Sequence, residues 1–190
     1  MAVAPDLPFE HGLDIKKGWF DMASLDYSAK LGTVGYTLPR GRVVHVEHAG
    51  GQEVFLPGVR ATDVAIFLLN GSADADVSNP GTTASGKFMH QAIAPTGKLS
   101  GVVATGGYEI DSTEFDSSQS YAAGDLLTAP LGVTAGDAAT GGLLTNVSGE
   151  GSVTQYVDPV VGVVSSGKHT NHNGVSTLSF WSVWLPGAAT

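Results

Sequence analysis

The chain has 190 residues, 42% of them hydrophobic, which is enough to build one buried core and excludes a largely disordered chain. Its 26 glycines and its charged content of only 14% exclude a helical bundle and favour an all-β fold. The formal net charge of −9 excludes a typical nucleic-acid-binding protein, because phosphate contacts need clustered Lys and Arg.

Residues 1–32 are predicted to form an extended docking arm. Pro5 and Pro8 disfavour a helix there, and the bulky apolar residues keep no sustained period. So much apolar surface must lie in a groove, either on the parent domain or on another molecule. The residues expected to bind a partner through this arm are Phe9, Leu13, Ile15, Lys16, Lys17, Trp19 and Phe20.

Residues 33–190 are predicted to form a single β-rich domain, a β-barrel or a jelly-roll-like β-sandwich. Residues 42–47 alternate as a strand, and residues 53–56 are expected to pair with them as a hairpin. Residues 62–69 form the strongest continuous apolar run of the first half and predict a central strand. Residues 70–86 consist almost entirely of turn formers and predict a long surface loop.

An acidic stretch over residues 108–121 follows a second apolar segment at residues 99–105. We expect this stretch to be a solvated loop, since its carboxylates stand among Ser and Thr. An alternative reading is that Glu109 and Asp111 share one face of a strand and serve as a cation site or an acid/base pair.

The segment from residue 120 to residue 185 is predicted to organise the fold. The sequences GDLLT and GLLT begin at Gly124 and Gly142, and each indicates a short strand entered through a glycine turn. Residues 160–164 are valine-rich and favour a strand. Residues 178–185 are apolar on both alternating faces, so this strand needs cover on both sides, from the core or from a neighbouring subunit. The residues predicted to supply that core or subunit interface are Phe180, Trp181 and Trp184.

The sequence carries none of the usual sequence motifs of hydrolases or nucleotide-binding enzymes. It has no cysteine, no nucleophile elbow and no phosphate-binding loop. We therefore predict a protein that is not an enzyme and has no catalytic residues, cofactor or metal. Two ion sites stay open as alternatives, at Asp74 with Asp76 and at His169 with His172.

The glycine-entered repeats, the valine run followed by Ser-Ser-Gly, and the closing sequence LSFWSVWLP resemble the decoration, or cement, proteins of tailed-bacteriophage heads. The resemblance covers about residues 120–186 and transfers no functional residue. It implies a virion structural protein on the capsid exterior that binds the major capsid protein and stabilises the head. It further implies a homo-oligomer, a dimer or trimer.

Location is predicted from the first residues and from the apolar runs. The first ten residues lack the pattern of a secretory signal, and the apolar runs are too short to span a bilayer. We therefore expect a protein made in the host cytoplasm that binds neither membrane nor nucleic acid.

An alternative function is a receptor- or glycan-binding module of the fibre or spike type. Trp181 and Trp184, together with the loops at residues 70–86 and 165–174, would supply its binding surface.

Overall fold

The computed structural model of the protein is all-β in the residues it describes, and no helix occurs among them. The predicted all-β class is thereby confirmed. Within these residues no helix is long and apolar enough to cross a membrane. The described residues are 13–18, 26–31, 38–49, 52–68, 98–104, 107–132, 140–148, 151–154, 157–171 and 174–188.

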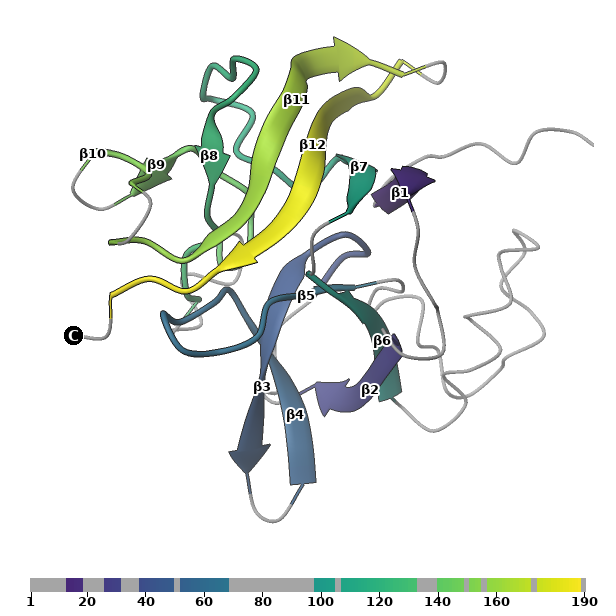
Figure 1. The fold of residues 1–190 in the computed structure, drawn as a ribbon. Helices are drawn as coiled ribbons and strands as arrows, with labels where there is room; N and C mark the ends of the chain where they lie inside the picture. The colour runs from purple at the N-terminus through teal and green to yellow at the C-terminus, as the bar shows by residue number, and fades with distance from the viewer. Residues whose placement is uncertain are drawn as a thin grey trace, which may run out of the picture.

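One half of the structure is a five-stranded antiparallel sheet in which the long hairpin of β11 and β12 dominates (Figure 1). Its two longest strands carry the valine run and the two-sided apolar segment, as the sequence predicts. A separate two-stranded ribbon pairs β9 (Val147–Ser148) with β10 (Gly151–Ser152). In order across the large sheet, the strands are β1 (Leu13–Gly18), β7 (Tyr108–Ser112), β12 (Ser176–Leu185), β11 (Val160–Thr170) and β8 (Leu126–Leu127).

The other half is a closed five-stranded barrel. All its strand pairs are antiparallel except the parallel pair of β2 and β4. The hairpin of β3 and β4 confirms the predicted pairing of residues 42–47 with residues 53–56. In order around the barrel, the strands are β2 (Asp26–Leu31), β4 (Gln52–Pro57), β3 (Val43–Ala49), β5 (Ile66–Leu68) and β6 (Lys98–Val103).

The predicted central strand at residues 62–69 is shorter than expected. Only Ile66–Leu68 form β5, and residues 61–63 form a turn. Val64 is 50% exposed, so an apolar run by itself does not mark a buried strand here. The turn bends the chain before it enters the barrel, and Asp63 N donates to Arg60 O at 3.2 Å.

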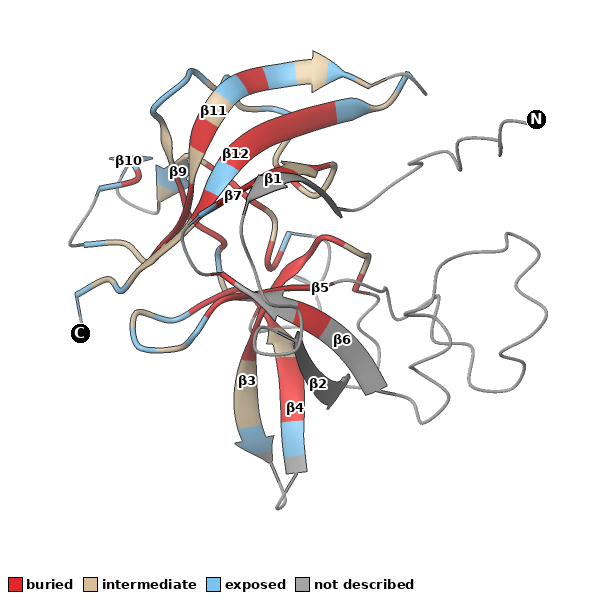
Figure 2. Cartoon of the chain, turned by 45° about the vertical axis from the view of Figure 1, so that its right-hand side comes forward, coloured by how far each residue is buried: buried red, intermediate tan, exposed pale blue. Residues whose placement is uncertain are grey.

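The main hydrophobic core lies between the barrel and the inner face of the large sheet. Neighbouring residues Ile110, Phe180 and Val164 form a row across β7, β12 and β11, and all three are buried. Figure 2 shows buried residues concentrated along β5, β7 and β12. Phe67 and Ala104 bring the barrel into the same cluster, so both halves share one core.

Two backbone hydrogen bonds link residues in or next to the barrel with the chain that follows β8. Val43 N donates to Gly142 O at 3.0 Å, and Val59 N donates to Ala129 O at 3.0 Å. Gly142 has a φ of 76°, and a β-carbon there would lie 2.2 Å from Val43 O. Only glycine fits at this position, which explains one of the two turn glycines that the sequence analysis singled out.

Residues 13–18 and 26–31, both within the segment predicted to be an arm, contribute strands to the body. β1 pairs with β7 from Leu13 to Gly18, and β2 pairs with β6 across the barrel. These residues therefore belong to the strands of the sheet and the barrel. The rest of residues 1–32 lies outside the described residues, and its docking role stays a prediction.

The prediction that the acidic stretch is a solvated loop is wrong for residues 108–112. These residues form β7, in which Tyr108 and Ile110 are fully buried and Glu109 is 7% exposed. The sequence misled because Glu109 and Asp111 alternate with buried residues on a strand whose outer face is polar. Serine hydroxyl groups on β11 and β12 donate hydrogen bonds to these two carboxylates.

Candidate functional site

The outer face of the large sheet, opposite the core, carries an exposed apolar row. Trp181 on β12 is directly opposite Val163 on β11, and Val163 is directly opposite Leu126 on β8. Residues directly opposite each other on antiparallel strands place their side chains on the same face. Trp181 is 42% exposed, and Val163 and Leu126 are partly exposed, so the row is open to a partner.

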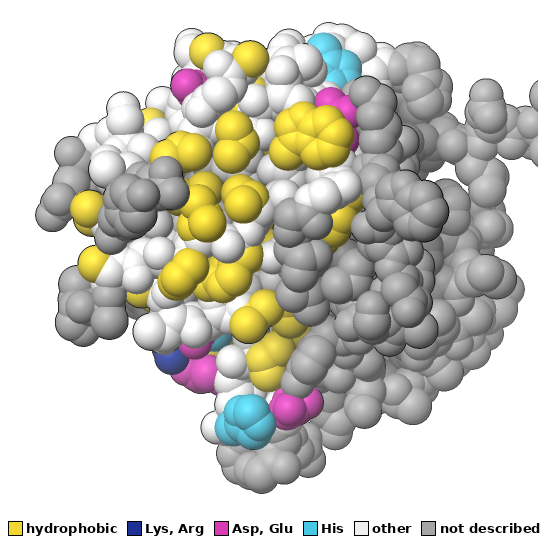
Figure 3. Space-filling view, viewed as in Figure 1, with side chains coloured by type: hydrophobic (Ala, Val, Ile, Leu, Met, Phe, Trp, Pro, Cys, Tyr) yellow, Lys and Arg dark blue, Asp and Glu magenta, His cyan; other side chains and the backbone are white. Residues whose placement is uncertain are grey.

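One further apolar residue extends this row along β12. Ser182 is buried and Trp184 packs against the core, so alternation places Val183 on the side of Trp181. The register with β11 shifts beyond Ser182, and Leu185 is directly opposite the fully buried Val160. Figure 3 shows several apolar side chains over β8, β11 and β12, with backbone and polar atoms between them. We call this surface the outer apolar face, defined by Leu126, Val163, Trp181 and Val183.

A polar border adjoins the outer apolar face on β7. Glu109 is directly opposite Trp181, and its Oε1 accepts a hydrogen bond from Ser165 Oγ at 2.8 Å. Asp111 Oδ1 accepts a hydrogen bond from Ser179 Oγ. His169 Nε2 lies 3.7 Å from Asp111 Oδ2, so an imidazolium there would pair with this carboxylate.

The chemistry of this surface suits binding better than catalysis. A serine, an aspartate and a histidine meet at Asp111, but Ser179 is fully buried and donates to the carboxylate, so no histidine activates it. Among the described residues, no group of three or more His, Asp or Glu side chains could hold a metal ion. The exposed indole, by contrast, offers a large apolar contact with a polar edge.

The structure separates the three aromatic residues predicted as core or interface. Phe180 is fully buried and packs against Phe67, while Trp184 is partly buried against the same cluster. Trp181 alone faces outward. The two tryptophans thus lie on opposite faces of β12, as alternation requires.

The remaining predicted residues divide between β1 and the parts of the chain that are not described. Leu13, Ile15, Lys16 and Lys17 lie on β1, where only the backbone is described. His169 lies on β11 beside Asp111. The residues outside the described part of the chain are Phe9, Trp19, Phe20, Asp74, Asp76 and His172.

Sequence reasoning missed Leu126 and Val163 as members of the surface. Each was predicted to be in a strand, but its face depends on which strand lies beside it. The one available signal was the two-sided apolar pattern of residues 178–185, which required a partner for Trp181 without identifying it.

No known protein family, curated protein or solved structure matches this chain. Its function is therefore inferred from its own residues and their geometry.

Proposed function

We propose that this protein is a virion structural component, a decoration protein that binds the major capsid protein on the capsid exterior and stabilises the head. The observation that carries the proposal is the outer apolar face, where Trp181 is 42% exposed on the central strand of the large sheet. Contiguous exposed apolar surface favours a protein partner, and tryptophan is enriched among residues that dominate binding energy.

The stabilising effect follows from binding the assembled shell. A protein that bridges neighbouring shell subunits binds only the assembled state, so it lowers the free energy of that state by mass action. The sheet packs on the buried core behind Trp181, which limits the conformational entropy lost on docking. A dimer or trimer of the protein would multiply these contacts.

The test begins with the particles themselves. Quantitative mass spectrometry of purified particles is expected to find this protein at a fixed ratio to the major capsid protein. Stripped particles should then rebind the purified protein. Trp181→Ala is expected to weaken rebinding by about thirtyfold or more, the loss typical of a residue that dominates an interface.

Val64→Ala is the matched control, because Val64 is an exposed apolar residue on the turn before β5 and lies outside the outer apolar face. It should rebind like the unchanged protein. Particles that lack the protein, or equal rebinding of Trp181→Ala and Val64→Ala, would contradict the proposal.

A second candidate function, glycan binding, is favoured by the polar border. An exposed indole on the same sheet as the partly exposed His169 combines a stacking surface with a polar group that can bond to a sugar hydroxyl. A glycan array probed with the unchanged protein and with Trp181→Ala separates the two functions. Saccharide binding that disappears in the variant, with no binding to particles, would favour this candidate.

A further inference from the structure

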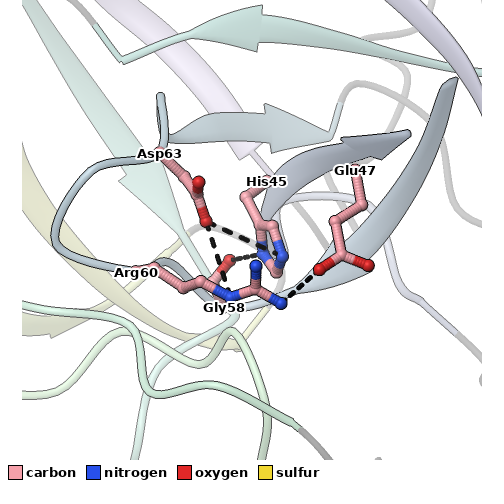
Figure 4. A network of polar contacts seen from close by, with 5 residues as sticks. All are labelled: His45, Glu47, Gly58, Arg60 and Asp63. Carbon is pink, nitrogen blue, oxygen red and sulfur yellow. Dashed lines mark hydrogen bonds and ion pairs between the residues drawn. The ribbon is translucent and has the colours of Figure 1, made fainter. Parts of the chain in front are cut away.

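A buried histidine lies where the chain leaves the barrel toward the large sheet. His45 on β3 is 1% exposed, and its Nδ1 lies 2.8 Å from Gly58 O (Figure 4). A backbone carbonyl can only accept a hydrogen bond, so Nδ1 carries a proton. In the neutral ring, Nε2 must then present a lone pair.

That lone pair faces a carboxylate. His45 Nε2 lies 3.8 Å from Asp63 Oδ2, and within the described residues both atoms are buried without a hydrogen-bond partner. In the neutral state two acceptors therefore face each other, which is unfavourable for buried groups. Protonation of Nε2 turns the contact into a donor facing an acceptor.

Asp63 belongs to a group of charged side chains. Arg60 Nε lies 3.8 Å from Asp63 Oδ2, and Arg60 pairs with Glu47 through Nη2. Figure 4 shows these side chains converging beside His45 from β3 and from the loop that follows β4. With a neutral imidazole the four side chains carry a net charge of −1, and with an imidazolium they are balanced.

The loop at residues 58–65 also links the barrel to the chain that follows β8. Gly58 N donates to Val43 O at 2.9 Å, and the N–H of the next residue, Val59, donates to the carbonyl of Ala129, two residues beyond β8. A contact that holds both Gly58 and Asp63 therefore restrains residues 58–65, from the junction to the turn.

We propose that His45 is a proton-dependent clasp on residues 58–65. As an imidazolium it donates to Gly58 O through Nδ1 and to Asp63 through Nε2, closing the loop on β3. On deprotonation it keeps the first contact and loses the second, so the loop loosens as pH rises. This proposal does not depend on the protein's being a decoration protein.

Backbone amide hydrogen exchange of residues 58–65 tests the clasp between about pH 5 and 8, the range in which an imidazole ordinarily changes charge. After correction for intrinsic exchange rates, protection should be about tenfold greater at the acidic end, the effect of one hydrogen bond between charged groups. Asp63→Asn should remove this pH dependence.

His45→Asn should also remove it, because the asparagine amide can still donate to Gly58 O but does not titrate. His48→Asn is the matched control, since His48 pairs with Glu53 at 3.4 Å on an exposed part of the β3 and β4 hairpin. That variant should keep the full pH dependence.

Nuclear magnetic resonance of the His45 ring gives an independent reading that needs no variant to fold. A ring that stays neutral throughout this range would overturn the proposal. Equal pH dependence of protection in the unchanged protein and in Asp63→Asn would overturn it as well.

Discussion

The ring of Phe67 on β5 lies 5.6 Å from the ring of Phe180 on β12, at an interplanar angle of 47°, so an aromatic contact joins the barrel to the large sheet. Both side chains are fully buried. Because the two halves share this core, we expect them to unfold in one cooperative transition.

Replacing Phe180 with alanine is expected to destabilise the whole protein by about 3–5 kcal/mol, since it removes a buried ring and leaves a cavity. Urea unfolding followed by circular dichroism measures this loss. Trp181→Ala, one residue along β12, should cost much less because its side chain is partly exposed. Similar losses in both variants would contradict the assignment of the two faces.

The ion pair between Arg42 and Glu114 is expected to matter because it is buried. Arg42 Nη2 lies 2.9 Å from Glu114 Oε2, and the two side chains are only 7% and 13% exposed. Glu114→Ala should cost about 3 kcal/mol, because it removes the carboxylate partner of a buried guanidinium. The exposed pair of His48 and Glu53 gives the control, and Glu53→Ala should change the free energy of unfolding by less than about 1 kcal/mol.

Alanine in place of either turn glycine is expected to lower the stability of the fold, by different amounts at the two positions. Gly124 and Gly142 have φ values of 95° and 76°, so alanine at either position should cost about 1–2 kcal/mol of backbone strain. At Gly142 the new β-carbon would also meet Val43 O, whereas at Gly124 nothing lies within 4 Å. Gly142→Ala should therefore lower the midpoint of thermal unfolding clearly more than Gly124→Ala, and equal shifts would refute the close approach.

Because Tyr121 is partly buried, we expect the folded protein to lose stability at alkaline pH. Burial raises the pKa of Tyr121 to about 12, and the charge of Asp116 adds to this effect. Its hydroxyl donates to Asp116 O at 2.9 Å. The unfolded chain ionises this group near pH 10, while the folded protein holds it neutral, so its stabilising contribution is complete below about pH 10 and is lost as pH rises toward 12.

Denaturant unfolding of the unchanged protein and of Tyr121→Phe at several pH values measures this contribution. The unchanged protein should lose stability more steeply than the variant between about pH 10 and 12. The phenolate absorbance that develops near pH 12 in the unchanged protein should be smaller in Tyr121→Phe. Parallel stability profiles would rule out the effect.

Strand patterns with one clear period could be predicted from the sequence. The hairpin of β3 and β4 follows from alternation and a glycine turn, and the two-sided pattern of residues 178–185 identifies β12 as a strand that is apolar on both faces. These features are local, so a single stretch of sequence contains the information.

Features that depend on distant pairing could not be predicted. β7 lies between β1 and β12, and the hydroxyl groups that satisfy Glu109 and Asp111 come from β11 and β12. Without those partners the stretch resembles a solvated loop. For the same reason Trp181 could be named as a candidate surface residue, but its neighbours Val163 and Leu126 could not.

The position of β12 also constrains how a nascent chain can fold. β12 lies between β7 and β11, although it is the last of the five sheet strands in chain order. Until the ribosome has released it, β7 and β11 have no shared neighbour, and their edges and apolar sides remain exposed. Folding of this half therefore has to follow synthesis of β12, and a chain truncated before that strand should be a target for chaperones and proteases.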